Sequence, residues 1–124
     1  MPDAQEMKLI SCEELKAKLE GGEDFKLVMT YHEWAYRAKH IPGSLNIHSE
    51  ESAKGLIQPT DAIVVYCVNQ SCQASVQAYR DLSSHGFANV QRFAGGLQEW
   101  EEKGFPLEGE QVEKTIEPDD NFNL

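Results

Sequence analysis

The sequence contains no long apolar run and few basic residues. None of its apolar stretches approaches the roughly 20 consecutive residues that cross a bilayer. Acidic residues outnumber basic ones, with 21 Asp and Glu against 11 Lys and Arg, and the net charge is -10. Nucleic acids and anionic lipid surfaces would repel such a chain. We therefore expect a soluble protein that binds no nucleic acid and no membrane and acts on a small ligand or a protein partner.

Cysteine is also scarce, with three residues in the chain. An odd count gives no disulfide framework, and neither an apolar leader nor an arginine-rich presequence is recognisable. We therefore predict a cytoplasmic protein whose thiols are mostly reduced. The four histidines are scattered and no set of four spaced Cys or His ligands exists, so we expect no metal site and no cofactor.

The length of the chain predicts a single folded domain, because 124 residues can bury one hydrophobic core but not two. Residues 1–7 form a polar lead-in that we expect to be flexible, and residues 8–107 form the domain. Residues 108–124 are acidic and have few apolar anchors. This composition predicts a mobile tail.

Strand-like and helix-like segments alternate along the domain. Ser11 and Glu14 form a capping-box pattern at the start of the first helix. We expect strands at residues 25–29, 45–47, 62–66 and 90–93, and helices at residues 11–19, 34–38, 72–85 and 96–103. Such alternation predicts an α/β fold in which a parallel sheet carries helices on both faces.

Cys67 occupies the position best suited to chemistry. It follows the apolar strand at 62–66, and a short polar loop, 68–71, separates it from the next predicted helix. Functional groups of open α/β sheets collect beyond the carboxyl ends of the strands. The unpaired N–H groups and the dipole at a helix start favour the thiolate, which is the nucleophilic form. Inward-facing N–H groups of the loop could also form a nest for a sulfur anion.

Three motifs, in this order and spacing, resemble those of the rhodanese family. Residues 40–47, His-Ile-Pro-Gly-Ser-Leu-Asn-Ile, resemble its GHIPGAxNI signature, and residues 63–67 resemble its VVYC strand. Residues 95–107, which contain GGLQEW and then GFPL, resemble its GGxxxWxxxGxP ending. The combination is specific although each motif alone is weak. The resemblance covers residues 8–107.

The resemblance implies a three-layer fold with a central parallel sheet of about five strands flanked by helices. It also implies that the cysteine of an active loop accepts sulfane sulfur as a persulfide, and Cys67 matches that cysteine. The loop residues that would then surround the substrate are Val68, Asn69, Gln70, Ser71 and Gln73.

The chain departs from the family pattern in its charges. No Lys or Arg lies between Cys67 and Gln73, where thiosulfate-using relatives commonly have basic residues, and Met29 and Tyr31 replace a usual Asp-x-Arg pair. Thiosulfate would lack a counter-charge, which favours a neutral or protein-bound sulfur donor. Gln73 also stands where a related family of phosphatases and arsenate reductases has an arginine, so phosphate chemistry is not expected.

Cys72 is expected in the first turn of the helix that follows the loop. The resemblance implies that this position lies close to the catalytic sulfur, so that Cys72 could attack a Cys67 persulfide or sulfenate and form a disulfide. It could equally be a small side chain packed under the loop. Structural interpretations are favoured for three other residues: Cys12 as an inert thiol, His40 as the residue that fixes its turn, and Ser75 as hydrogen-bonded back to its own helix.

Three functions follow, in decreasing order of preference. The first is a sulfurtransferase or sulfur carrier that forms a persulfide on Cys67, with Cys72 as a candidate resolving thiol, and that needs a sulfane-sulfur donor and a thiol acceptor. The second is a redox module that cycles between dithiol and disulfide at the same pair. The third is a non-catalytic interaction domain that keeps only the fold.

Overall fold

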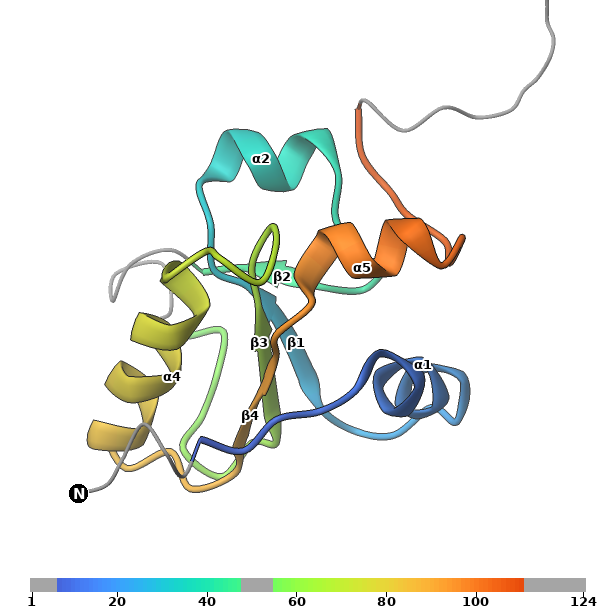
Figure 1. Ribbon diagram of the computed structural model, residues 1–124. Helices are drawn as coiled ribbons and strands as arrows, with labels where there is room; N and C mark the ends of the chain where they lie inside the picture. Colours follow the sequence, from blue (N-terminus) through green and yellow to red (C-terminus); the bar gives the residue numbers. More distant parts are fainter. Residues whose placement is uncertain (1–6, 48–54, 111–124) are drawn as a thin grey trace, which may run out of the picture.

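Four strands form one parallel sheet at the centre of the domain (Figure 1). The structure is a computed structural model that describes residues 7–47 and 55–110. The strand order is β2-β1-β3-β4, so the two most apolar strands lie in the middle. Along the chain the elements are α1 (Cys12–Glu20), β1 (Lys26–Met29), α2 (Glu33–Ala38), β2 (Leu45–Asn46), β3 (Ile63–Tyr66), α4 (Ala74–Ser84), β4 (Val90–Phe93) and α5 (Gly96–Glu102).

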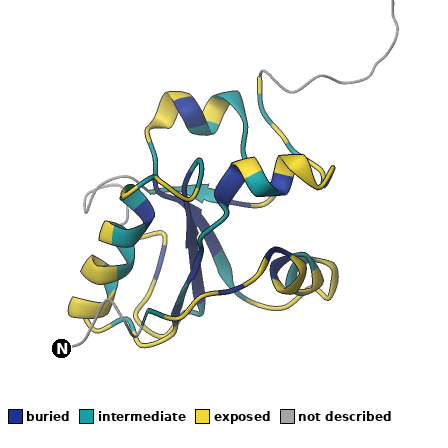
Figure 2. Cartoon of the chain, in the orientation of Figure 1, coloured by how far each residue is buried: buried dark blue, intermediate teal, exposed yellow. Residues whose placement is uncertain are grey.

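Helices cover both faces of the sheet, as the alternating pattern predicts. On one face α4 packs against a core of valine and isoleucine side chains from the strands. On the other face α1, α2 and α5 contribute Leu15, Ala35 and Trp100 to a second core. Successive side chains of a strand point to opposite faces, so each central strand supplies both cores. The predicted three-layer α/β arrangement is confirmed, with β1, β3 and β4 as its mostly buried centre (Figure 2).

The sheet has four strands in the described part of the chain, against about five expected. The segment before α1 occupies part of a fifth position, because Leu9 forms an isolated parallel bridge with Arg92. The N–H of Ile10 donates to the Arg92 carbonyl at 3.0 Å, and the Arg92 N–H donates to the Lys8 carbonyl at 2.8 Å. Ser11 follows at once as the N-cap of α1, and this leaves no length for a full strand.

The capping box at α1 is present as the sequence predicts. The Glu14 N–H donates to the Ser11 hydroxyl at 3.0 Å, and the Ser11 N–H donates to the Glu14 carboxylate at the same distance. Two N–H groups that the helix start would otherwise leave unpaired are thereby satisfied.

His40 fixes the turn that leads into β2, in agreement with its structural interpretation. Its Nδ1 lies 2.7 Å from the Tyr36 carbonyl, and its ring stacks on Tyr36 with centroids 4.0 Å apart. The turn is tied to β3 by the Tyr66 hydroxyl, which accepts the Ile41 N–H at 3.0 Å and lies 2.9 Å from the Ser44 hydroxyl. Burial raises the pKa of Tyr66 far above its ordinary value, so this hydroxyl stays neutral.

Residues 108–110 lie against the end of α2. His40 and Glu108 exchange two backbone hydrogen bonds of 2.8 and 2.9 Å, and the Glu110 N–H donates to the Arg37 carbonyl at 2.8 Å. The first three residues of the predicted tail are therefore attached to the domain. The remainder of that tail, 111–124, and residues 1–6 of the lead-in lie outside the described residues.

Cys12 is a buried thiol whose ionisation opposes folding. It is 1 % exposed, and burial, reinforced by the nearby Glu99 carboxylate, raises its pKa from 9.0 to about 11. The unfolded chain ionises this thiol at a lower pH than the folded protein does. Its contribution to stability is therefore complete below pH 9 and is lost as the pH rises toward 11.

We expect a Cys12→Ala protein to lose about 2 kcal/mol less stability than the wild type when the pH is raised from about 8.5 to 11. Urea unfolding at a series of pH values measures the difference. Tyr66 is common to both proteins, so its own alkaline ionisation cancels. Parallel stability curves for the two proteins would contradict this account of Cys12.

Candidate active site

The active loop, defined as residues 67–73, leaves the carboxyl end of β3 and leads into α4 (Figure 1). Cys67, its first residue, is 1 % exposed. The Leu97 N–H donates to the Cys67 carbonyl at 2.9 Å, and the Gln98 N–H donates to the Val68 carbonyl at 2.8 Å. The first turn of α5 thus holds the start of the loop in place.

Gly96 allows α5 to approach the loop this closely. Its φ is +65°, in the left-handed region that favours glycine. A Cβ at this position would lie 2.5 Å from the Cys67 carbonyl oxygen and 3.1 Å from the Asn69 nitrogen. Both the backbone conformation and the close contact therefore require glycine beside Cys67.

Asn69 organises the middle of the loop. Its side-chain oxygen accepts the Ser71 N–H at 3.0 Å, and its carbonyl accepts the Cys72 N–H at 3.2 Å. Two N–H groups of the expected anion nest are therefore bonded to Asn69. The same turn delays the start of α4 to Ala74, so Cys72 lies in the loop and not in the first helical turn as predicted.

Cys67 and Cys72 form a disulfide, and their Cα atoms are 6.2 Å apart. The structure thus brings together the two cysteines that the sequence put forward as catalytic. They differ in access, because Cys67 is buried whereas Cys72 is half-buried and lines a groove. Cys72 is therefore the member of the pair that the groove reaches.

The groove beside the loop has a volume of about 680 Å³, which is in the range of small-molecule sites. Of the active-loop residues 67–73, all except Cys67 and Gln70 line it. The lining consists of Val68, Asn69, Ser71, Cys72, Gln73 and Ala74 from the loop and the start of α4, Tyr31, Trp34, Ala35, Ala38 and Lys39 from α2 and its flanks, and Leu97 from α5.

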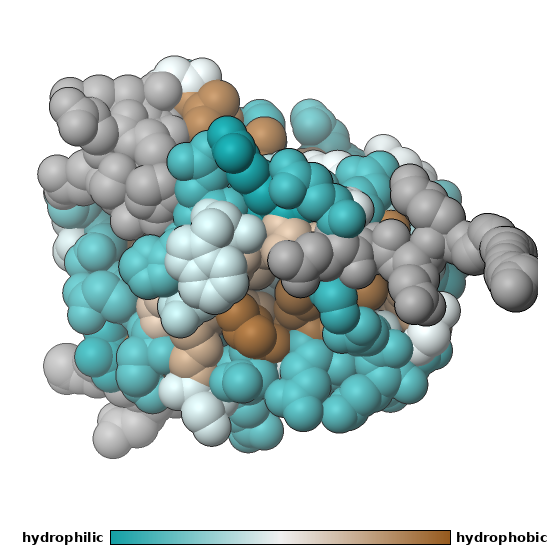
Figure 3. Space-filling model, turned by 90° about the horizontal axis from the view of Figure 1, so that it is seen from above, coloured by the Kyte–Doolittle hydropathy of each residue, from teal (hydrophilic) through white to brown (hydrophobic). Residues whose placement is uncertain are grey.

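The wall formed by α2 and its flanks is aromatic and nearly uncharged. Trp34 is 67 % exposed, and its ring lies 6.0 Å from that of Tyr31. Lys39 is the charged residue of the lining, and its Nζ is paired with the Glu101 carboxylate at 2.7 Å. Figure 3 looks onto the end of the molecule where α2 lies and shows pale and brown atoms surrounded by teal. The groove therefore offers apolar contact and no net charge.

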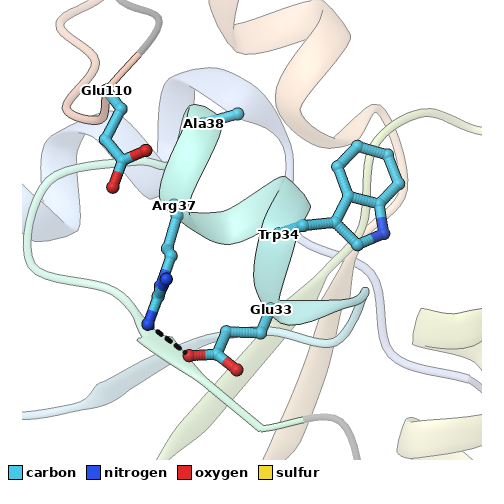
Figure 4. Close-up of a pocket in the computed structure, with 5 residues that line it drawn as sticks. All are labelled: Glu33, Trp34, Arg37, Ala38 and Glu110. Atoms are coloured by element: carbon cyan, nitrogen blue, oxygen red, sulfur yellow. Dashed lines mark ion pairs between the residues drawn. The ribbon is translucent and has the colours of Figure 1, made fainter.

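A second, smaller pocket of about 350 Å³ lies along α2 (Figure 4). Glu33 and Arg37 pair across it at 3.0 Å, and Glu110 completes its rim. Trp34 and Ala38 belong to both pockets. The smaller pocket contains none of the predicted site residues, and its Glu33 and Arg37 side chains are paired with each other on α2.

Neutral side chains occupy the place of the family's usual Asp-x-Arg pair. Met29 is fully buried in the core shared with α1 and α5. Thr30 donates its hydroxyl to the Tyr66 carbonyl at 3.2 Å, and Tyr31 lines the groove. This segment therefore contributes packing and a hydroxyl but no charge to the site.

Arg92 is the site residue that the sequence interpretation missed. From β4 its Nε donates to the Ser75 hydroxyl at 2.9 Å, and its Nη2 donates to the Gln70 carbonyl at 3.4 Å. Ser75 was expected to bond back to its own helix, but its hydroxyl instead accepts from Arg92. An arginine inside the predicted strand 90–93 was the available signal. The role of this arginine depends on β4 lying next to β3 in the sheet, and the residues around Arg92 in the sequence do not indicate which strand is its neighbour.

The structure adds two observations on other kinds of site. Within residues 7–47 and 55–110, no group of three or more His, Cys, Asp or Glu side chains is placed to hold a metal ion. None of the helices found in the same residues has the length and apolar character that a membrane crossing requires.

Comparison with known sequences identifies relatives over most of the chain. The family model described as Rhodanese-like domain matches residues 11–103. Thiosulfate sulfurtransferase 18 of Arabidopsis thaliana is 27% identical over 126 residues, which cover 90% of this chain and 91% of that protein. HTH-type transcriptional regulator Rv0324 of Mycobacterium tuberculosis is 35% identical over 97 residues, or 77% of this chain. The chain spans less than half of that regulator, because the match covers 42% of it.

Solved structures give the same result for the fold. The Rhodanese-like domain of the Alr3790 protein from Anabaena sp. superposes with a TM-score of 0.75 and is 30% identical, and the match covers 94% of this chain and 89% of that domain. The BH2092 protein of Bacillus halodurans has a TM-score of 0.77 at 23% identity, with 86% of this chain and 80% of that chain covered. The second likeness concerns the fold alone.

Proposed function

This chain belongs to the rhodanese-like domain family, and on that premise we propose that it is a sulfurtransferase or sulfur carrier that forms a persulfide on Cys67. The observation that carries the proposal is the placement of Cys67. It lies at the carboxyl end of β3, in a loop held by α5 and adjoining a groove of small-molecule size. The likeness to a protein named as a thiosulfate sulfurtransferase supports the same reaction class.

The proposed reaction has a loading step and a resolving step. The Cys67 thiolate attacks the outer sulfur of a donor persulfide, and the donor's S–S bond breaks so that the donor leaves as a thiolate. An acceptor thiolate that attacks the outer sulfur of the Cys67 persulfide carries that sulfur away and leaves Cys67 reduced. If Cys72 attacks the inner sulfur instead, hydrosulfide leaves and the Cys67–Cys72 disulfide forms. Two equivalents of a cellular thiol would then restore the dithiol.

The charge of the site supports a neutral or protein-bound donor. The loop has no charged side chain, and Lys39 in the groove wall is paired with Glu101. A free dianion such as thiosulfate would also be repelled by a chain of net charge -10. We propose that the donor is a protein persulfide, that the acceptor is a thiol, and that the protein works in the cytoplasm, where thiols keep the pair reduced between cycles.

A second function, a redox module, is favoured by the Cys67–Cys72 disulfide itself. In this alternative an oxidant converts Cys67 to a sulfenate, Cys72 displaces water or hydroxide from it, and the disulfide is the signal. The 35% identical segment of a protein named as a transcriptional regulator supports a reporting role. The sulfur-transfer proposal is preferred because it accounts for the groove as well as for the pair.

The deciding experiment is the intact mass of freshly reduced protein after separate exposure to polysulfide, to thiosulfate and to dilute hydrogen peroxide, with peptide mapping under non-reducing conditions. A gain of about 32 Da on Cys67 with polysulfide supports sulfur transfer. A loss of about 2 Da across Cys67 and Cys72 with peroxide, and no persulfide with either donor, supports the redox module. A protein that undergoes neither change would be assigned to the third class, a non-catalytic interaction domain.

A further inference from the structure

Arg92 lies on the same face of the sheet as Cys67. In the β3–β4 register Arg92 is opposite Val65, and Val65 and Cys67 are two residues apart along one extended segment. Alternation of side chains therefore directs Val65 and Cys67 to one face, where Val90 and α4 also pack. The hydrogen bond from Arg92 to the Gln70 carbonyl shows that the guanidinium reaches the active loop from this face of the sheet.

Among the residues that the structure describes, the Arg92 guanidinium is buried and has no negative partner. Arg92 is 8 % exposed, and burial lowers its pKa. Its acceptors are the Ser75 hydroxyl and the Gln70 carbonyl, both neutral, and no carboxylate pairs with it in the described part of the chain. Burying a charge among neutral groups costs folding free energy, so the presence of Arg92 at this position calls for an explanation.

The surroundings of the loop leave Cys67 as the available counter-charge. Residues 68–73 carry no charge, and the first turn of α4 contains no acidic residue. In the groove above the loop, Lys39 is already paired with Glu101, and Tyr31 is the other titratable side chain besides Cys72. Reduced Cys67, in contrast, becomes an anion when its thiol loses a proton to solvent.

We propose that Arg92 is a positioning residue for the chemistry of Cys67: it binds the Gln70 carbonyl of the active loop and supplies, from the neighbouring strand, the positive charge that stabilises the anionic sulfur of reduced Cys67. The inference rests on the proposed function, in which that sulfur is the nucleophile. Arg92 touches neither donor nor acceptor. Its effect is on the fraction of Cys67 present as thiolate and on the shape of the loop that surrounds it.

This role accounts for the absence of basic residues from the loop. A cation within the loop would face the groove and attract free anions to it. A cation beneath the loop stabilises a sulfur anion at Cys67 and leaves the groove surface neutral and apolar. The placement thus reconciles a thiolate nucleophile with a neutral or protein-bound donor.

The test measures the ionisation of Cys67 without any sulfur donor. In a fully reduced Cys72→Ser background, the rate of alkylation of Cys67 by iodoacetamide is followed against pH, with peptide mass mapping to separate Cys67 from Cys12. Arg92→Gln removes the charge but keeps an amide that can bond to Ser75 and Gln70. Arg92→Lys keeps the charge and loses the planar fork, and Arg80→Met, an exposed site on α4, is the control of matched net charge.

We expect Arg92→Gln to raise the pH midpoint of alkylation by about one unit, which makes alkylation about tenfold slower below the midpoint. Arg92→Lys and Arg80→Met should remain within about 0.3 units of the parent protein. An unchanged midpoint in Arg92→Gln, or equal shifts in the Gln and Lys proteins, would overturn the proposal. If Arg92→Gln lacks a native circular dichroism spectrum, the Arg92→Lys protein is used for the test. Because lysine keeps the positive charge, a shift of about one unit in the alkylation midpoint of Arg92→Lys would contradict a charge effect.

The alkylation experiment and the persulfide experiment can fail separately. If Arg92→Gln shifts the alkylation midpoint but the protein forms no persulfide, the role of Arg92 is supported and the sulfur-transfer proposal is refuted. If the protein forms a persulfide but Arg92→Gln leaves the midpoint unchanged, the sulfur-transfer proposal is supported and the role of Arg92 is refuted.

Discussion

Replacing Cys67 with serine should abolish transfer of sulfane sulfur from polysulfide to a small thiol, with a loss of at least about a thousandfold, or about 4 kcal/mol in transition-state stabilisation. A serine hydroxyl is almost entirely protonated at neutral pH and is a poor nucleophile toward sulfur. The side chains are nearly the same size, and Cys67 lies in a loop held by backbone bonds from α5, so the fold should persist. Persulfide on the protein is counted by mass and hydrosulfide release by a colorimetric assay.

Two further variants make the result specific to this cysteine. Cys12→Ala removes an equally buried thiol from α1, and we expect the transfer rate to stay within about twofold of the wild type. Cys72→Ser should still load sulfur on Cys67 but should not form the intramolecular disulfide, so persulfide accumulates until an external thiol removes it. Equal loading of the Cys67→Ser and wild-type proteins would place the reactive sulfur elsewhere and refute the assignment.

The second large effect is expected from Gly96→Ala, which should destabilise the folded protein by about 3 kcal/mol and disorganise the active loop. The new methyl group would meet three backbone atoms of the loop, at 2.5 Å from the Cys67 oxygen and 3.1 Å from Asn69 N and Val68 C. Backbone cannot rotate away as a flexible side chain can. Either α5 or the loop has to move, and the hydrogen bonds that hold Cys67 are lost.

Gly104→Ala is the matched control. Gly104 also has a left-handed backbone, with φ +76°, but a Cβ there would meet nothing within 4 Å. Its substitution should cost only the conformational strain, about 1 kcal/mol. Urea unfolding and the alkylation rate of Cys67 are compared in the two variants. Equal losses of stability, with Cys67 reactivity unchanged in both, would show that contact with the loop is not what requires Gly96.

The local signals in the sequence determined the elements and their order. The capping box of Ser11 and Glu14 set the start of α1, and the apolar run that ends at Tyr66 set β3. Alternation of such segments was sufficient for a parallel sheet between helices. The position of Cys67 followed from the same pattern, because the carboxyl end of a central parallel strand is fixed once the strand is known.

Helix boundaries that depend on specific hydrogen bonds were harder to predict from the sequence. The sequence placed Cys72 in a helix, but the bonds that Asn69 accepts hold it in the loop beside Cys67. An Asn can cap, turn or face solvent, and its choice depends on the surrounding backbone. The resemblance nevertheless implied that Cys72 lies near Cys67, and the structure brings the two together.

The tertiary structure alone decided which distant side chains lie around the loop of Cys67. Trp34 from α2 forms a wall of the groove, and Arg92 from β4 reaches beneath the loop. Neither residue is adjacent to Cys67 in sequence, and the loop itself contains no charged residue. Strand neighbours and helix packing bring these groups together, and both depend on contacts summed over the whole domain. The sequence by itself therefore determined the fold and the place of Cys67 at the end of β3, whereas the chain's packing determined the electrostatic environment of that residue.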